Sequence, residues 1–177
     1  MSISALHENI DGFYKKIAEE HQEDMACKKG CDKCCYVALS IFPIEADYIT
    51  DCFEALNQQN RDKLVTLWNS PVSEGEDLFG KQIRACAFLY EGACSIYEAR
   101  PGICRTQGAP MIRKEVNQME LDVCSLNFKT TEPTIEMSYD LNRLNMLLSL
   151  AQNSKPSKRF TKERVTLNQL KKFLSNL

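Results

Sequence analysis

Hydrophobic and polar positions alternate with a helical period at the start of the chain. Five apolar residues lie three or four positions apart, with polar residues between them: Ile3, Leu6, Ile10, Phe13 and Ile17. Because an α-helix has about 3.6 residues per turn, such residues share one face. The pattern predicts an amphipathic helix over residues 3–24 that packs this face against a core.

A second helical pattern follows a short apolar segment. Residues 36–41 are apolar and include strand-forming types, which predicts a short strand. Four residues then recur at every fourth position: Ile44, Tyr48, Cys52 and Leu56. We expect a helix that begins near Pro43, since proline is tolerated in the first turn, with Ser40 as its cap. Cys52 is then a buried thiol of the core rather than a ligand.

Shorter patterns predict the middle of the chain. Apolar residues within Asn60–Asn69 indicate a short helix, and the polar segment that follows, residues 70–82, indicates a loop. Residues 87–90 and 95–97 are expected to form two short strands that turn at Glu91-Gly92.

The last third of the chain returns to the helical period. Residues 111–123 are expected to contribute a pair of strands. Regularly spaced leucines then predict a helix over residues 137–152, and the apolar spacing after Thr161 predicts a final helix.

Length and composition are those of a folded protein. The chain has 177 residues, of which 44% are hydrophobic and 26% are charged, which is enough for one domain with a core. We therefore expect a single domain over residues 1–177, mainly α with a small Cys-rich loop and β-hairpin region.

Charge and hydropathy narrow the class of function. The formal net charge is -2, so sequence-independent nucleic-acid binding has little electrostatic support, and the basic residues between Lys155 and Arg164 are expected to be solvated surface. No segment approaches the roughly 18 apolar residues of a membrane span. The N-terminal segment also lacks the apolar run of a secretory signal. We therefore expect no membrane as a partner and a cytoplasmic location.

Nine cysteines need an explanation in a chain expected in the cytoplasm, where thiols stay reduced. Their odd number leaves at least one unpaired in any disulfide scheme, so disulfides or redox exchange are the less favoured interpretation. Thiolates are soft ligands that suit zinc, copper(I) and iron–sulfur clusters. With Cys52 assigned to the core, eight candidate metal ligands remain: Cys27, Cys31, Cys34, Cys35, Cys86, Cys94, Cys104 and Cys124.

The eight candidates fall into two groups of four along the chain. In the first group, Cys31 and Cys34 have the two-residue gap common to zinc fingers and iron–sulfur loops. In extended backbone, the adjacent Cys34 and Cys35 would point to opposite faces, so we expect them to have different roles. Eight thiolates suit two four-ligand sites, a binuclear site with a bridging thiolate, or one cluster with spare thiols.

Other residues near the cysteines bear on the charge of a site. Four thiolates on a divalent ion leave a net charge of about minus two, which must be compensated when buried. Five cations are candidates for this role, beside an ordinary surface role: Lys28, Lys29, Lys33, Arg100 and Arg105. His21 is a weak ligand candidate. Glu45 is an oxygen-ligand candidate, but stabilisation of a helix start is the favoured interpretation.

Together these blocks resemble the cysteine-cluster family called CxxCxxCC or YkgJ-type, a zinc- or iron-chelating domain. The resemblance covers residues 24–128, with flanking helices in residues 1–23 and 137–177. The matching positions are Cys27, Cys31, Cys34-Cys35, Pro43, Glu45, Cys86, Phe88-Leu89, Cys94, Ile96-Tyr97, Arg100-Pro101 and Cys104-Arg105, with Cys124 as a less specific match.

The resemblance implies a transition metal ion as the bound partner. We expect zinc held by cysteine thiolates in a structural or metal-handling role, with helices packed around a metal-stapled core; iron or an iron–sulfur cluster is the alternative. Related domains occur in flagellin lysine-N-methylases, so a redox or methyl-transfer role stays open, as does an interaction module with a structural metal. An enzyme is less favoured, because only two histidines are present and no HExxH or phosphate loop is found.

Overall fold

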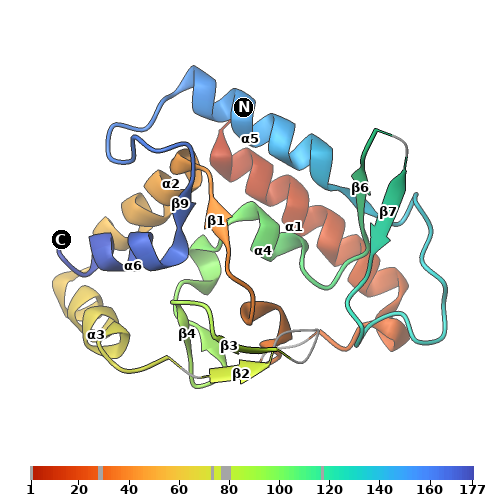
Figure 1. Ribbon diagram of the computed structural model, residues 1–177, viewed down its shortest axis with the longest axis horizontal. Coiled ribbons are helices and arrows are strands. Elements are labelled where there is room, and N and C mark those ends of the chain that lie inside the picture. Colours follow the sequence, from red (N-terminus) through yellow and green to blue (C-terminus); the bar gives the residue numbers. More distant parts are fainter. Residues whose placement is uncertain (1, 28–29, 73, 77–80, 117) are drawn as a thin grey trace. The chain divides into compact units, whose positions relative to one another are not determined.

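Helices dominate the computed structural model of the protein, which describes residues 2–27, 30–72, 74–76, 81–116 and 118–177 (Figure 1). Six α-helices lie in this described part of the chain, together with short strands in small sheets of two or three. The mainly α prediction with a β-hairpin region is confirmed. None of the described helices is long and apolar enough to span a bilayer.

The chain forms two compact units, each built from two separate stretches of sequence. Unit 1 consists of Met1–Lys28 and Gly102–Ser154, and unit 2 consists of Lys29–Pro101 and Lys155–Leu177. The chain therefore leaves unit 1 between the first two candidate ligands, Cys27 and Cys31, and returns to it just before Cys104.

Unit 1 begins with α1 (Ile3–Glu20), which the side chain of Ser2 caps by accepting a hydrogen bond from the amide of Ala5 at 3.2 Å. Leu6, Ile10 and Ile17 are buried, so the predicted apolar face is the face that packs. The helix is shorter than expected, because a 3-10 turn, η1 (Gln22–Asp24), replaces its last residues.

The rest of unit 1 packs around this helix. The short helix α4 (Gly102–Thr106) contacts α1, and β6 (Met111–Lys114) pairs antiparallel with β7 (Met119–Asp122), as the sequence predicted. On its other edge β6 pairs in parallel with β8 (Tyr139–Asp140), which leads directly into α5 (Leu141–Ser154). Figure 1 shows α5 starting beside this sheet, and Leu144, Leu148 and Ala151 are its buried residues.

Unit 2 has a larger apolar core. Its helices are α2 (Pro43–Glu54), α3 (Gln58–Trp68) and α6 (Leu167–Leu174). The final helix starts later than the sequence suggested, because Val165 and Thr166 form β9, which pairs with β1 (Ser40–Ile41). The core cluster consists of Ile41, Ala46, Ile49, Phe53, Trp68, Ala87, Phe88, Tyr90, Val165, Leu167, Leu170 and Leu174.

The start of α2 differs from the predicted one. The cap residue is Phe42, and Ser40 lies in β1 opposite Thr166, so the expectation that Ser40 caps the helix is wrong. Glu45 supplies the capping group instead, because its Oε2 accepts a hydrogen bond from the amide of Phe42 at 3.0 Å. A carboxylate at this position also interacts favourably with the helix dipole, which agrees with the helix-start interpretation of Glu45.

Two hairpins lie between α3 and the end of unit 2's first stretch. The strands β4 (Leu89–Tyr90) and β5 (Ala93–Cys94) turn at Glu91 and Gly92, as predicted, and both turn residues have positive φ (50° and 71°), as two-residue hairpin loops require. Residues 95–97 are not a strand. Ser95 donates its amide to Phe88 at 2.8 Å, and Tyr97 begins the 3-10 turn η3 (Tyr97–Ala99).

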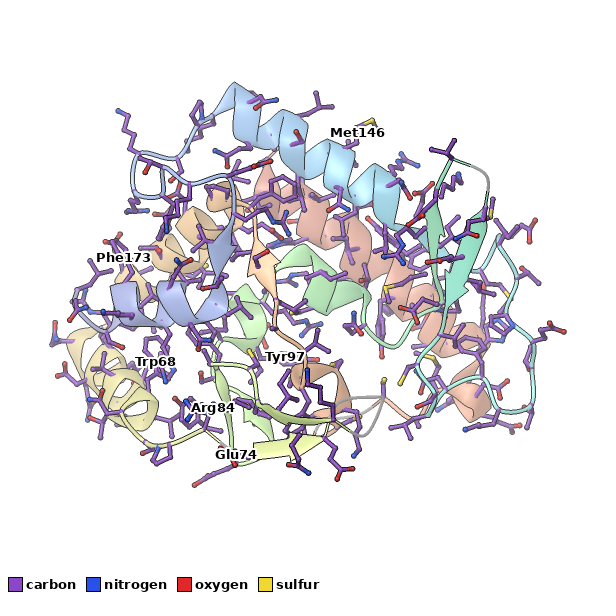
Figure 2. All side chains as sticks on the ribbon, in the orientation of Figure 1. Trp68, Glu74, Arg84, Tyr97, Met146 and Phe173 are labelled. Atoms are coloured by element: carbon purple, nitrogen blue, oxygen red, sulfur yellow. The ribbon has the colours of Figure 1, made fainter. Side chains whose placement is uncertain are left out.

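The other hairpin corrects the predicted loop over residues 70–82. Glu74–Glu76 and Gln82–Arg84 pair as β2 and β3, and the Glu74 and Arg84 side chains lie across from each other with 3.8 Å between oxygen and nitrogen (Figure 2). The sequence did not predict this hairpin, because its strands are polar and lack the alternating apolar residues by which a strand is recognised. Residues 77–80 lie outside the described part of the chain.

Candidate metal centre

The eight predicted ligands are divided between the two units. Unit 2 carries Cys31, Cys34, Cys35, Cys86 and Cys94, and unit 1 carries Cys27, Cys104 and Cys124. All nine cysteines of the chain, Cys52 included, are free thiols. Cys52 lies on α2 as predicted, but it is half-buried rather than fully enclosed.

The adjacent pair in unit 2 lies in a 3-10 turn, η2 (Lys33–Cys35), and not in extended backbone. The amide of Cys35 donates to the carbonyl of Asp32 at 2.8 Å, which closes this turn. The expectation that the two side chains point to opposite faces is therefore wrong, since the thiol of Cys35 hydrogen-bonds to the sulfur of Cys34.

This hydrogen bond shifts the pKa values of the two thiols in opposite directions. It lowers the pKa of Cys34 to about 7, because the bond stabilises the Cys34 thiolate, and it raises the pKa of Cys35, which must keep its proton to donate. Cys34 is exposed and Cys35 is half-buried. The pair thus consists of an exposed thiol whose pKa is lowered and a half-buried thiol whose pKa is raised.

Two further thiols of unit 2 come from the hairpin region. Cys86 is tied to the first cysteine segment by its amide, which donates to the carbonyl of Cys35 at 2.7 Å. Cys94 lies in β5 opposite Leu89. Burial raises the pKa of both thiols, that of Cys94 to about 11, and the charge of the Cys34 thiolate raises them further.

The electrostatic interactions define the group of thiols in unit 2. Three effects raise the pKa of Cys35. The largest is its hydrogen bond to Cys34, the second is its burial, and the third is the charge of Cys34, Cys86 and Cys94. Charges act on a pKa only when they are close or poorly screened. The fold of unit 2 therefore gathers thiols from two distant segments of the sequence, which we call the unit 2 thiol group: Cys34, Cys35, Cys86 and Cys94.

Among the described residues, two cations act on this group: Lys171 lowers the pKa of Cys86, and Arg100 acts on two other members. The guanidinium of Arg100 lies 3.8 Å from the centre of the Tyr97 ring, a residue that Figure 2 labels in the segment after β5. Besides the hydrogen-bonding and burial effects above, its charge lowers the pKa of Cys34 and of Cys94. Arg100 therefore has the predicted charge-compensating effect on cysteine thiolates.

The other predicted cations have different surroundings. Arg105 is buried in unit 1 and forms an ion pair with Asp11 of α1, with 2.6 Å between nitrogen and oxygen. Lys33 is exposed on η2, and Lys28 and Lys29 lie outside the described residues. His21 lies in unit 1 with its ring 5.5 Å from that of Phe128.

The half-buried Cys27 is contacted by two residues that the sequence did not single out. The side-chain amide of Asn127 donates to its Sγ at 3.3 Å, and a Cβ on Gly108 would stand 2.6 Å from the same sulfur. The backbone amide of Asn127 also donates to the carbonyl of Cys124 at 2.9 Å. An asparagine in a polar loop has no periodic signal, so only the folded structure reveals this arrangement.

The remaining thiols of the prediction are half-buried. Cys104 lies on α4 and Cys31 precedes η2. Across the described ranges, no group of three or more His, Cys, Asp or Glu side chains is placed so that it could hold a metal ion. The donors suit a soft metal chemically, but the described residues do not show the predicted metal-stapled core.

Helices, short hairpins and nine free thiols define a mainly α, cysteine-rich domain. A family model, CxxCxxCC, described as "Putative zinc- or iron-chelating domain", matches residues 26–125. Since the match covers more than half of the chain, the protein belongs to the CxxCxxCC family. Comparison with curated proteins and with solved structures gave no match.

Proposed function

We propose that the protein binds zinc through cysteine thiolates, and that the unit 2 thiol group supplies one set of ligands. The observation that carries this proposal is that the fold joins two separate cysteine segments, since the amide of Cys86 donates to the carbonyl of Cys35 at 2.7 Å and Cys94 lies in the hairpin that follows Cys86. Four thiolates are a complete ligand set for tetrahedral zinc. Arg100 would offset part of the negative charge of such a site.

Metal binding on this proposal is coupled to a local rearrangement and to proton release. The thiols must converge on the ion and lose their protons, including the one that Cys35 donates to Cys34. The short hydrogen-bonded link between Cys35 and Cys86 keeps the two cysteine segments together before the ion arrives. Ordering them in advance lowers the entropic cost of binding.

A second set of ligands would come from unit 1, which carries Cys27, Cys104 and Cys124. Cys31 is the remaining candidate, next in sequence to the first set. Zinc with four thiolate ligands has no open coordination position, so we assign a structural or metal-handling role in a reducing compartment such as the cytoplasm and no catalysis.

Metal analysis of protein purified without oxygen and without added metal tests the proposal. We expect at least one equivalent of zinc and a colourless solution. A brown preparation with broad visible absorption and stoichiometric iron would instead support an iron–sulfur cluster, the other metal class in the family description. Less than about half an equivalent of any transition metal would contradict metal binding altogether.

Cysteine variants assign the ligands. Cys86→Ser and Cys94→Ser remove one thiolate each from the unit 2 thiol group and should lower zinc affinity by at least about tenfold in competition with a chelator, since loss of even a supporting contact costs that much. Cys52→Ser is the matched control, because this thiol lies on α2 and is not part of the group. Equal affinities for the three variants would refute the assignment.

A further inference from the structure

Asn127 is a highly connected polar side chain near the cysteines of unit 1. It is only 3% exposed, and its Nδ2 donates to the carbonyl of Gly108 at 2.6 Å and to Cys27 Sγ at 3.3 Å. Its Oδ1 accepts from the amide of Ala26 at 2.9 Å. A buried amide with donors and acceptor all satisfied is fixed in orientation, because any rotation would leave a buried polar atom unpaired.

These bonds join the three cysteine-bearing segments of unit 1. Ala26 directly precedes Cys27. Gly108 lies two residues after the end of α4, the helix that carries Cys104. The backbone amide of Asn127 binds the carbonyl of Cys124 at 2.9 Å. One residue therefore connects the segments of all three unit 1 candidates.

Gly108 lets Cys27 come close. Its φ is +100°, a conformation that side-chain-bearing residues rarely adopt, and a Cβ would stand 2.6 Å from Cys27 Sγ. Only glycine leaves room for the thiol between this backbone and the amide of Asn127.

The residue after Asn127 is held in an unfavourable conformation. Phe128 has φ +52°, which is rare for a bulky side chain, and its amide donates to the carbonyl of Asp24 at 2.8 Å. Such strain persists where the surroundings over-determine the backbone, and it is concentrated at functional sites. The strained turn fixes the position from which Asn127 reaches Cys27.

We propose that Asn127 is a positioning residue that orients Cys27, and with it the cysteine segments of unit 1, for metal binding. The inference rests on the proposed zinc-binding function and extends it to a residue that is not itself a ligand. An N–H donor on a ligating thiolate fixes the direction of the sulfur lone pairs and offsets part of the sulfur's charge.

The test compares Asn127→Asp with Asn142→Asp. The first substitution keeps an acceptor for the Ala26 amide but removes the donor to Cys27. Asn142 is a matched control, because its side-chain amide also accepts one hydrogen bond and donates another: it accepts from the amide of Lys114 at 2.8 Å and donates to the carbonyl of Lys114 at 2.9 Å. Both partners are backbone groups, so this substitution removes no contact with a thiol. Asn127→Ser removes the same donor without adding a charge.

The readout is the alkylation rate of each cysteine in zinc-loaded protein, measured by mass spectrometry after proteolysis. We expect Cys27 to react at least about tenfold faster in both Asn127 variants than in wild type and Asn142→Asp, with Cys86 and Cys94 unchanged. In the cobalt-substituted protein, the thiolate-to-metal charge-transfer band should weaken in the Asn127 variants only.

If Cys27 in both Asn127 variants is alkylated at a rate within about twofold of the wild-type rate, the inference is overturned, because the change is well below the expected effect. Failure of both Asn127 variants to fold with and without zinc would also overturn it, because Asn127 would then be a residue of the fold. Wild-type protein without metal would overturn the proposed function and this inference together. Zinc-loaded wild type in which only the Cys27 comparison fails would overturn the inference alone.

Discussion

Two adjacent cysteines have opposite acid–base behaviour in this protein. Cys34 accepts a hydrogen bond from the Cys35 thiol in the η2 turn, so its thiolate is favoured near neutral pH while Cys35 stays protonated. The difference arises chiefly from one hydrogen bond, and the charges of Cys34, Cys86 and Cys94 raise the pKa of Cys35 further. The two residues are thus distinct before any metal is considered.

This difference predicts a pH profile for thiol alkylation in the metal-free protein. Because the thiolate is the nucleophile, the Cys34 rate should rise with pH and level off above about pH 7, whereas Cys94 should keep gaining reactivity towards about pH 11. Site-resolved mass spectrometry after short iodoacetamide pulses measures both. Cys35→Ala removes the donor and should move the Cys34 midpoint to higher pH; an unmoved midpoint would contradict the role of the hydrogen bond.

Asp24 stabilises the loop that follows Asn127. Hydrogen bonds from Thr131 and Thr130 lower the pKa of its carboxyl to about 2, and Oδ1 accepts from the amide and hydroxyl of Thr130 at 3.0 and 2.7 Å. A carboxyl with a depressed pKa contributes stability above its unfolded pKa of about 4, and that stability is lost as the pH falls towards about 2.

Asp24→Asn should therefore lower the thermal midpoint at about pH 7, and the difference from wild type should shrink between about pH 5 and pH 2. Thermal unfolding followed by circular dichroism at several pH values is the measurement. Glu19→Gln, at an exposed position of α1, is the control and should leave the midpoint unchanged within error. A difference that is independent of pH would contradict ionic hydrogen bonding by Asp24.

At the scale of the secondary-structure elements, the β2–β3 hairpin packs directly on the cysteine segment of unit 2. A Cβ on Gly75 would overlap the ring of Tyr36, the residue after Cys35, and the Tyr36 hydroxyl donates to Asp32 at 3.4 Å. The hairpin therefore depends on a bare backbone at one position. The ring in turn fills the space next to the 3-10 turn.

Gly75→Ala should destabilise the protein by about 1–3 kcal/mol, the usual cost of overpacking, because Tyr36 or the strand must shift. Chemical denaturation gives the free energy of unfolding. Gly12→Ala is the contrasting variant: Gly12 is exposed within α1 with nothing near its Cβ position, so alanine should stabilise by about 0.5–1 kcal/mol. A neutral or stabilising Gly75→Ala would show that the ring moves freely.

Helix starts illustrate what can be predicted from local sequence. Pro43 and an acid two residues later predicted the start of α2 correctly, because proline and carboxylates are favoured in a first turn for local reasons. The end of α1 and the start of α6 were misplaced, since a 3-10 turn and a strand pairing with distant residues replace helix there. Such choices depend on partners far away in sequence.

At the scale of the whole molecule, the fully buried core residues include none of the nine cysteines. In unit 2, the buried core cluster consists of apolar side chains, and the partly buried Cys86 and Cys94 pack against it. Each fully buried large apolar side chain contributes about 1.5–3 kcal/mol. The core therefore supplies stability that does not depend on a metal.

On the proposed zinc-binding function, removal of zinc should lower the thermal midpoint and leave the helical circular dichroism signal intact at room temperature. Small zinc domains without such a core unfold when they lose an ion whose binding contributes about 10–16 kcal/mol. The measurement is far-UV circular dichroism before and after chelation, with zinc added back. Loss of the helical signal would favour an interaction module whose fold is held by its metal.

Residue identity and spacing alone were enough to predict the family, the apolar face of α1 and the paired strands of residues 111–123. These features rest on local backbone preference and on patterns that a single chain displays directly. Arg100 was also predictable as a compensating cation, because it lies close to the cysteines in sequence.

Which thiols meet depended instead on long-range packing. The fold gathers Cys34, Cys35, Cys86 and Cys94 in unit 2, assigns the remaining thiols of the second group to unit 1, and places Asn127 against Cys27. It also replaces the expected extended Cys34-Cys35 segment by a turn, which makes the two thiols hydrogen-bonding partners. The hydrogen bond from Asn127 to Cys27 joins residues 100 positions apart, so it depends on packing of distant segments that no local pattern encodes.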